Sequence, residues 1–178
     1  MNDSPQETGQ PDENNSAAGP PVLLRDVLFE LEGQSDEWCA FVNRQTGEVV
    51  GLSSDAFHVL EEGELDEDEY YGDATPEMIK LATDIDGSSN YVSLPDQFEI
   101  HEWEIMRDFA MELDNDQSQS QLLNAVHGDR AFRRFKDTVF ELGLRDEWYG
   151  FRKAALEQIA IRWLDRNNIP WARDRQAT

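Results

Sequence analysis

The spacing of apolar residues changes at Pro95, and this change constrains the fold more than any other feature of the sequence. Before Pro95, short apolar runs such as 38–42 and 49–52 are separated by turn residues, which is typical of strands. After Pro95, apolar residues recur every three or four positions, which is typical of amphipathic helices. The sequence therefore predicts an α+β fold, in which a small antiparallel sheet from the N-terminal half packs with about four C-terminal helices.

The first half is expected to contain one helix and two hairpins. Residues 22–31 have the apolar spacing of a helix, which Gly33 can end. Residues 38–52 predict a β-hairpin with Gly47 in its turn, where a positive φ is needed. A second hairpin is predicted from 78–83 and 90–94, around the turn at 86–89.

The second half is expected to be helical. Asp96 is a predicted N-cap, Asp129 caps a later helix, and the last helix runs from about 145 to 167. The predicted inward faces are Trp103, Met106, Ala110 and Leu113; Phe132, Phe135, Val139 and Leu142; and Trp148, Phe151, Ala155, Ile159 and Trp163. Four of these aromatic residues are predicted to form one cluster, namely Phe132, Phe135, Trp148 and Phe151.

The composition indicates one domain with tails. The 178 residues are 39% hydrophobic, which is enough for one core. Residues 1–21 contain four of the seven prolines and are expected to form a disordered acidic tail. We expect 22–171 to form a single α+β domain and 172–178 to form a C-terminal tail, while the acid-rich residues 61–73 are expected to form a solvated loop or a frayed helix end.

The net charge of −23 limits the partners. Such a charge argues against binding of nucleic acid or anionic lipid over the whole surface, so any nucleic-acid contact would be local, at residues 130–136. No run approaches the roughly 18 apolar residues of a membrane span, and the N-terminus lacks a signal-peptide pattern. We therefore expect a cytoplasmic protein with no membrane contact. The single cysteine, Cys39, excludes an intramolecular disulfide.

Motifs of known chemistry fail on their spacing. His101 and Glu102 begin a zinc-protease motif, but Ile105 stands where the second histidine is required. His58 and His101 each stand three residues before a glutamate, which leaves open a metal site between helices or two incidental histidines on an acidic surface. No nucleophile elbow or phosphate-binding glycine loop is present. We expect no metal and no cofactor, and favour a non-enzymatic role.

One basic cluster stands out in the acidic sequence. Its cations lie at the start of one predicted helix, and aromatic residues follow at the start of the next, so together they could clamp an anion and stack on its flat part. Alternatively, the cations pair with acids of the same chain, as Arg133 could with Asp129 and Asp137. The candidate binding residues are Arg130, Arg134, Lys136, Trp148, Tyr149 and Arg152.

The same region carries a resemblance to a known family. The run GDRAFRRFKD at 128–137, the run WYGFR at 148–152, and the segments 91–95 and 102–109 resemble the bacterial uncharacterised protein family 0158. The likeness covers roughly residues 22–171. It implies a small bacterial cytosolic protein and assigns a catalytic role to no residue.

Two classes of function follow. The first, which we favour, is a non-enzymatic acidic interaction module that binds another protein, either through the basic cluster or by presenting its acids as a mimic of nucleic acid. The second is a ligand-binding or enzymatic domain that uses the basic and aromatic residues to hold a phosphorylated or other anionic ligand. Convergence of Arg134, Lys136 and Arg152 on one concave surface would favour the second class.

Overall fold

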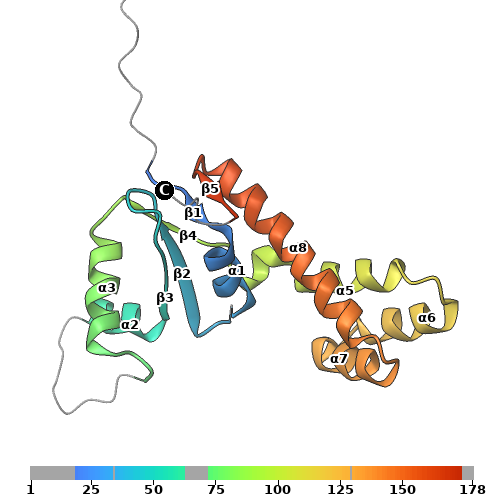
Figure 1. The fold of residues 1–178 in the computed structure, drawn as a ribbon. Coiled ribbons are helices and arrows are strands. Elements are labelled where there is room, and N and C mark those ends of the chain that lie inside the picture. Colours follow the sequence, from blue (N-terminus) through green and yellow to red (C-terminus); the bar gives the residue numbers. More distant parts are fainter. Residues whose placement is uncertain (1–18, 34, 63–71, 129, 174–178) are drawn as a thin grey trace, which may run out of the picture.

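A small sheet lies at one end of the molecule and a group of helices at the other, with one long helix running between them (Figure 1). The computed structural model describes residues 19–33, 35–62, 72–128 and 130–173. In chain order the elements are β1 (Val22–Leu23), α1 (Leu24–Glu32), β2 (Trp38–Asn43), β3 (Val49–Ser53), α2 (Asp55–Glu62), α3 (Pro76–Asp86), β4 (Tyr91–Ser93), α4 (Gln97–Ile100), α5 (Glu102–Met111), α6 (Asp116–Ala125), α7 (Ala131–Glu141), α8 (Arg145–Arg166) and β5 (Trp171–Ala172).

The predicted α+β class is confirmed. The main sheet is antiparallel, with the strand order β3-β2-β4. The predicted hairpin is β2 and β3, in which Trp38 lies opposite Ser53 and Val42 lies opposite Val49. After Pro95 the chain is helical as expected, because α5, α6, α7 and α8 follow the single turn of α4.

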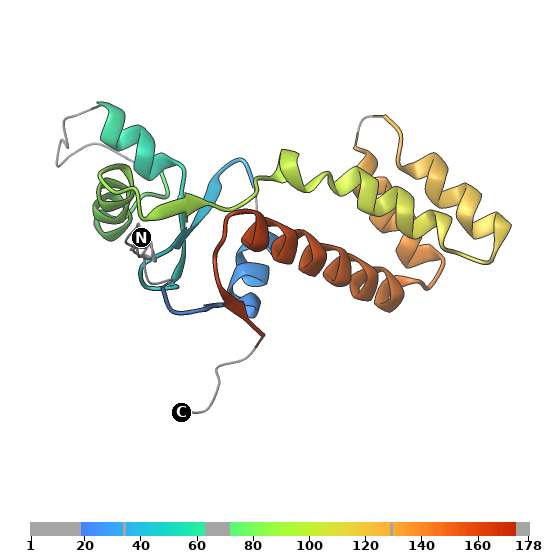
Figure 2. The same cartoon turned by 90° about the horizontal axis from the view of Figure 1, so that it is seen from above.

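Both faces of the sheet are covered. Ala40 and Val42 of β2 belong to the core cluster that contains residues of α1 and α8. Cys39 and Phe41, which alternate with them, pack against a second cluster that includes Ala56 of α2. Because side chains of a strand point alternately to its two faces, the sheet is a middle layer between α1 with α8 on one side and α2 with α3 on the other (Figures 1 and 2).

The second predicted hairpin is wrong in its first strand. Residues 76–86 form the helix α3, which begins with Pro76 in its first turn and has Thr75 as its N-cap. The Thr75 hydroxyl accepts a hydrogen bond from the Met78 amide at 3.3 Å. The second predicted strand does form, as β4, but it pairs with β2, so its partner is far away in the sequence.

The two ends of the described chain meet in a separate two-stranded sheet. β1 and β5 pair in parallel, and Ala172, which the sequence analysis placed in the tail, lies opposite Leu23. Gly19 and Pro20 lie against the β2–β3 turn, since a Cβ on Gly19 would stand 2.1 Å from the Arg44 carbonyl oxygen. Residues 1–18, most of the predicted tail, and residues 63–71 of the predicted acidic loop lie outside the described residues.

A left-handed residue separates α4 from α5. Asp96 caps α4 as predicted, in a capping box with Glu99. His101 then adopts φ 51° and ψ 54°, which ends α4 after one turn and starts α5 in a new direction. The resulting inward face of α5 differs from the predicted one, because Trp103 is 49% exposed. The buried residues of α5 are Ile105, Met106, Phe109 and Ala110.

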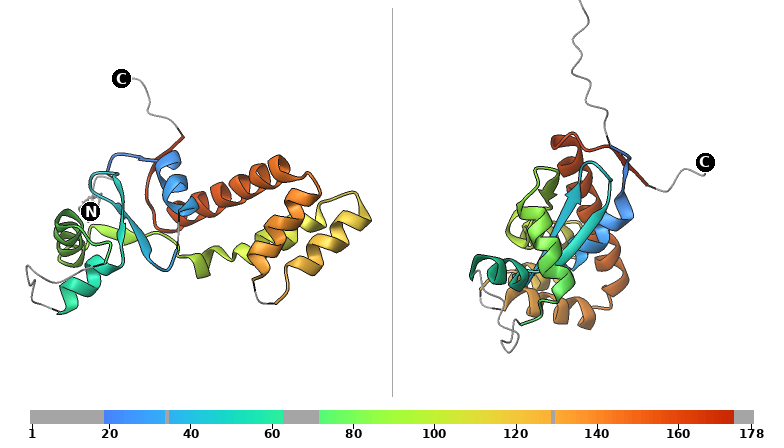
Figure 3. Two further views of the ribbon diagram at one scale, coloured as in Figure 1. Left: turned by 90° about the horizontal axis from the view of Figure 1, so that it is seen from below. Right: turned by 90° about the vertical axis from the view of Figure 1, so that its left-hand side faces the viewer.

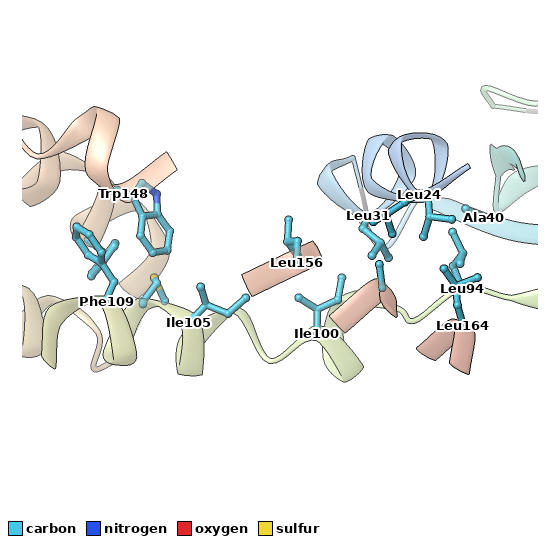
Figure 4. Packing of buried hydrophobic residues seen from close by; sticks show 14 of the residues in the cluster. Leu24, Leu31, Ala40, Leu94, Ile100, Ile105, Phe109, Trp148, Leu156 and Leu164 are labelled. Atoms are coloured by element: carbon cyan, nitrogen blue, oxygen red, sulfur yellow. The ribbon is translucent and has the colours of Figure 1, made fainter. Parts of the chain in front are cut away.

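Helix α8 connects the two ends of the molecule through one continuous core (Figures 3 and 4). Its buried residues lie along its whole length, from Trp148 near α5 to Leu164 near Leu94 and the sheet. The predicted inward face is thus fully buried at Trp148, and its other four residues are partly buried against the same core cluster. The fully buried residues are Trp148, Leu156, Ala160 and Leu164, whereas Phe151, Ala155, Ile159 and Trp163 are half-buried.

Candidate functional site

Arg134 bonds to the turn that precedes its own helix. Its guanidinium donates a hydrogen bond to the His127 carbonyl, in the turn between α6 and α7. Arg130 is the N-cap residue of α7 and has a left-handed φ of 60°, while the predicted cap, Asp129, lies outside the described residues. Both arginines are solvent-exposed, but the hydrogen bond gives Arg134 a structural partner.

Arg152 forms an ion pair inside the molecule. Its Nε lies 2.6 Å from Glu102 Oε1 and its second nitrogen lies 3.3 Å from Glu102 Oε2, so the pair is bidentate and links α8 to α5. The two side chains are 20% and 24% exposed. Because the carboxylate neutralises the guanidinium at short range, Arg152 offers little uncompensated positive charge to a ligand.

Trp148 is part of the core and presents no stacking face, which corrects one predicted binding residue. It is 1% exposed and packs edge-on against Phe109 and Phe135. Phe151 completes this cluster through Phe109, at a ring distance of 5.5 Å. Phe109 therefore takes the place predicted for Phe132, which is 42% exposed.

The remaining predicted residues lie on the surface. Lys136 Nζ stands 5.1 Å from the centre of the Phe132 ring, and the Arg145 guanidinium stands 5.8 Å from the centre of the Tyr149 ring. Tyr149 is 45% exposed. These contacts are cation–π pairs within single helices, at a spacing of four residues.

The predicted residues do not converge on one concave surface. A central cavity of about 340 Å³ lies between α1, α4, α5, α7 and α8, and Arg152 is the one predicted binding residue in its wall. Arg134 bonds to the turn before α7 instead, and Lys136 extends over Phe132. The lining residues of this central cavity are Leu31, Gln97, Ile100, Glu102, Met106, Phe132 and Arg152.

The exposed side of α7 combines aromatic and basic side chains. Phe132, Lys136 and Phe140 follow each other at intervals of four residues, so they lie on one face of the helix. Arg133 is exposed beside them, three residues before Lys136. We call these four residues the α7 face. Phe140 is 71% exposed, and Phe132 leads from this face into the central cavity.

Sequence reasoning missed a second hollow with basic and aromatic walls. It has a volume of about 380 Å³ and lies between the α4–α5 break and the C-terminal half of α8. We call it the α8 cavity, and its lining residues are Pro95, Glu99, His101, Ile159, Arg162, Trp163 and Arg166. The signal in the sequence is two arginines four residues apart, Arg162 and Arg166, with Trp163 between them. The sequence analysis predicts only a core face for this helix.

The described residues contain no group of three or more metal-ligating side chains. His58 stands on α2, with Nδ1 3.9 Å from an oxygen of Asp55. Cys39 is half-buried, and its Sγ lies 3.5 Å from the Leu52 carbonyl oxygen. Burial raises the pKa of this thiol above its ordinary value, so the thiolate needed for nucleophilic attack is disfavoured.

In the parts of the chain that the structure describes, each helix is either too short or too polar to cross a bilayer.

Comparison with known proteins identifies the family. No solved structure matches this chain. A curated relative, a UPF0158 protein of Pseudomonas aeruginosa, is 32% identical over 66 residues, which are 36% of this chain and 43% of the relative. The match thus spans less than half of that relative. The sequence also matches the Uncharacterised protein family (UPF0158) over residues 21–176, nearly the whole chain. The chain therefore belongs to the family UPF0158, as the resemblance had indicated.

Proposed function

We propose that this acidic protein is a non-enzymatic interaction module that binds another protein through the α7 face. The observation that carries the proposal is the exposure of two phenylalanines on one side of a single helix, Phe132 at 42% and Phe140 at 71%. Full removal of a side chain of this size from water contributes about 1.5 to 3 kcal/mol, and a residue that is already partly buried, such as Phe132, contributes less. A partner that covers both gains this free energy, and aromatic residues are the usual anchors of protein interfaces.

The central cavity offers an anchor point beside this face. Phe132 is part of its wall, together with apolar side chains such as Leu31 and Met106. Arg152 and Glu102 neutralise each other there, so the cavity suits an apolar side chain better than a small anion. A partner residue inserted beside Phe132 would extend the contact from the α7 face into the cavity.

The charge of the α7 face favours an acidic partner. Arg133 and Lys136 flank the two phenylalanines, and Arg130 is exposed at the start of the helix. The net charge of the whole protein is −23, so the basic surface that these cations form is local to this helix. An acidic amphipathic segment of another protein would complement it, because opposite charges across an interface steer association and fix its register.

Site-specific photo-crosslinking in the bacterial cell tests this proposal. A benzophenone amino acid in place of Phe140 should crosslink to a partner protein, whereas the same group in place of Phe29, which is 75% exposed on α1, should not. Reversing the charge with Lys136→Glu should remove most of the product, because it repels an acidic segment. Equal products at both positions would contradict the proposal, and so would a product formed only between copies of this chain.

A further inference from the structure

The α8 cavity lies apart from the α7 face, on the side of α8 that faces the α4–α5 break. Figure 2 shows α4 and α5 running alongside α8 over much of its length. Four of the lining residues come from α8 at positions 159, 162, 163 and 166. These intervals of three and four residues place them on one face of the helix, so the arginines and the indole share one wall.

The opposite wall depends on the break between α4 and α5. His101 lines the cavity and holds the left-handed conformation that ends α4. Glu99 is the one acidic lining residue. Its Oε2 accepts a hydrogen bond from the Asp96 amide at 3.2 Å, as part of the capping box of α4. The carboxylate of Glu99 thus has one backbone donor, which does not neutralise it, and it remains the one acid in the wall beside the two arginines.

Basic side chains outnumber acidic ones in the wall of the α8 cavity, which contains two arginines and one glutamate. Arg162 and Arg166 are both exposed, and neither forms an ion pair with any residue in the described ranges. Arg162, Glu99 and His101 also line an adjoining cavity of about 230 Å³, whose wall contains two further acids, Glu104 and Asp108. Asp108 is paired with Arg107 at 2.8 Å. Arg166 lines the α8 cavity but not the adjoining one, so its positive charge lies away from Glu104 and Asp108.

We propose that the α8 cavity binds a small phosphate monoester attached to a flat ring. Arg162 and Arg166, one helical turn apart, would bind the phosphate oxygens, because guanidinium groups match phosphate geometry and keep their charge. Trp163 lies between them in the sequence and would stack on the ring of the ligand. The volume of about 380 Å³ lies in the range of small-molecule sites.

Calorimetric titration with phenyl phosphate tests the site on the full chain. The double variant Arg162→Gln/Arg166→Gln should bind phenyl phosphate at least about tenfold more weakly than the wild type. The matched control is Arg133→Gln/Lys136→Gln, which removes the same charge from the α7 face and should change the affinity by less than about twofold. Equal weakening in both variants would overturn the proposal, because it would show attraction by net charge alone. So would a wild-type protein that binds no phenyl phosphate.

The indole of Trp163 provides a second measurement. Its Nε1–H resonance, assigned with Trp163→Phe, should move during the titration, and inorganic phosphate should bind more weakly than phenyl phosphate. Equal affinity for the two probes would overturn the role of Trp163. The melting temperature of Arg162→Gln/Arg166→Gln shows whether this variant is folded. The lysine variant, Arg162→Lys/Arg166→Lys, keeps the charge and should bind phenyl phosphate more tightly than the glutamine variant. Lys136→Glu should lose photo-crosslinking from position 140 but keep phenyl phosphate binding. This result would separate the α8 cavity from the α7 face.

Discussion

Phe135 is fully enclosed, and its nearest aromatic neighbours come from two other helices. It is 0% exposed, and its ring lies 4.8 Å from the ring of Trp148 and 6.3 Å from that of Phe109. Truncation to alanine would empty a site that no neighbouring side chain can fill without moving. Phe135→Ala should therefore lower the free energy of unfolding by about 3 to 5 kcal/mol, as measured by urea denaturation.

The matched change on the same helix is Arg134→Ala. It removes an exposed side chain with one hydrogen bond to a backbone carbonyl, so it should cost about 1 kcal/mol or less. If Arg134→Ala lowers the free energy of unfolding as much as Phe135→Ala does, Arg134 is a structural residue of the core. If Phe135→Ala leaves the free energy of unfolding unchanged, the enclosed packing described above is contradicted.

The contacts of the arginines explain why the candidate site could be predicted only in part. The spacing along α7 predicted an exposed face for Arg130, Arg133 and Arg134, and all three are exposed. Arg152 pairs with Glu102, fifty positions away, and no local pattern indicates which of many carboxylates will lie there. Trp148 fitted both a core stripe and a stacking surface, and its burial follows from the position of α5, which the sequence of α8 does not specify.

The elements themselves were more predictable where local signals agreed. The hairpin of β2 and β3 has two short apolar runs and a turn glycine, Gly47, with φ 69°. Helix α3 was missed although Thr75 and Pro76 form a strong start signal and the apolar residues follow helical intervals. The turn residues at 86–89, which are also typical of a hairpin, follow the end of this helix, where Gly87 is the C-cap. The break at His101 has no comparable signal, because a left-handed histidine depends on the packing around it.

The β2–β3 turn is also the place where the segment before β1 packs. Asn43 Oδ1 accepts hydrogen bonds from the amides of Gln45 and Thr46, at 2.9 and 3.2 Å, and so closes the turn. Gly47 follows, and a Cβ there would stand 2.6 Å from the Pro20 carbonyl oxygen. A side chain at this position thus meets both an unfavourable φ and the backbone of another segment.

Gly47→Ala and Gly143→Ala separate these two effects. Both glycines have φ 69°, but a Cβ on Gly143 would meet nothing within 4 Å. Gly143→Ala should cost about 1 to 2 kcal/mol for the left-handed conformation alone. Gly47→Ala should cost at least about 1 kcal/mol more, since residue 20 must move. Equal unfolding free energies for the two variants would show that the segment at 19–21 does not depend on the turn.

At the scale of the whole molecule, one core cluster extends over the length of an elongated shape. The sheet end and the end formed by α5, α6 and α7 lie far apart in Figure 1, yet α8 buries residues at both. One continuous cluster includes Val42 of the sheet, Leu156 at the middle of α8 and Phe135 of α7. The parallel pair of β1 and β5 adds a second link, because it joins the chain after α8 to the chain before α1.

This continuity predicts that the two ends unfold together. In urea, the loss of helix measured by circular dichroism and the change in tryptophan fluorescence should give the same midpoint. Val42→Ala at the sheet and Phe135→Ala in α7 should each move that one transition, because both side chains are 0% exposed in the same cluster. If the ends were separate domains, each variant would shift only one of two transitions, and the other would remain at the wild-type midpoint. Such a result would contradict the prediction of one domain over residues 22–171. It would show that packing around Leu156 and Ala160, at the middle of α8, is too weak to couple the unfolding of the two ends.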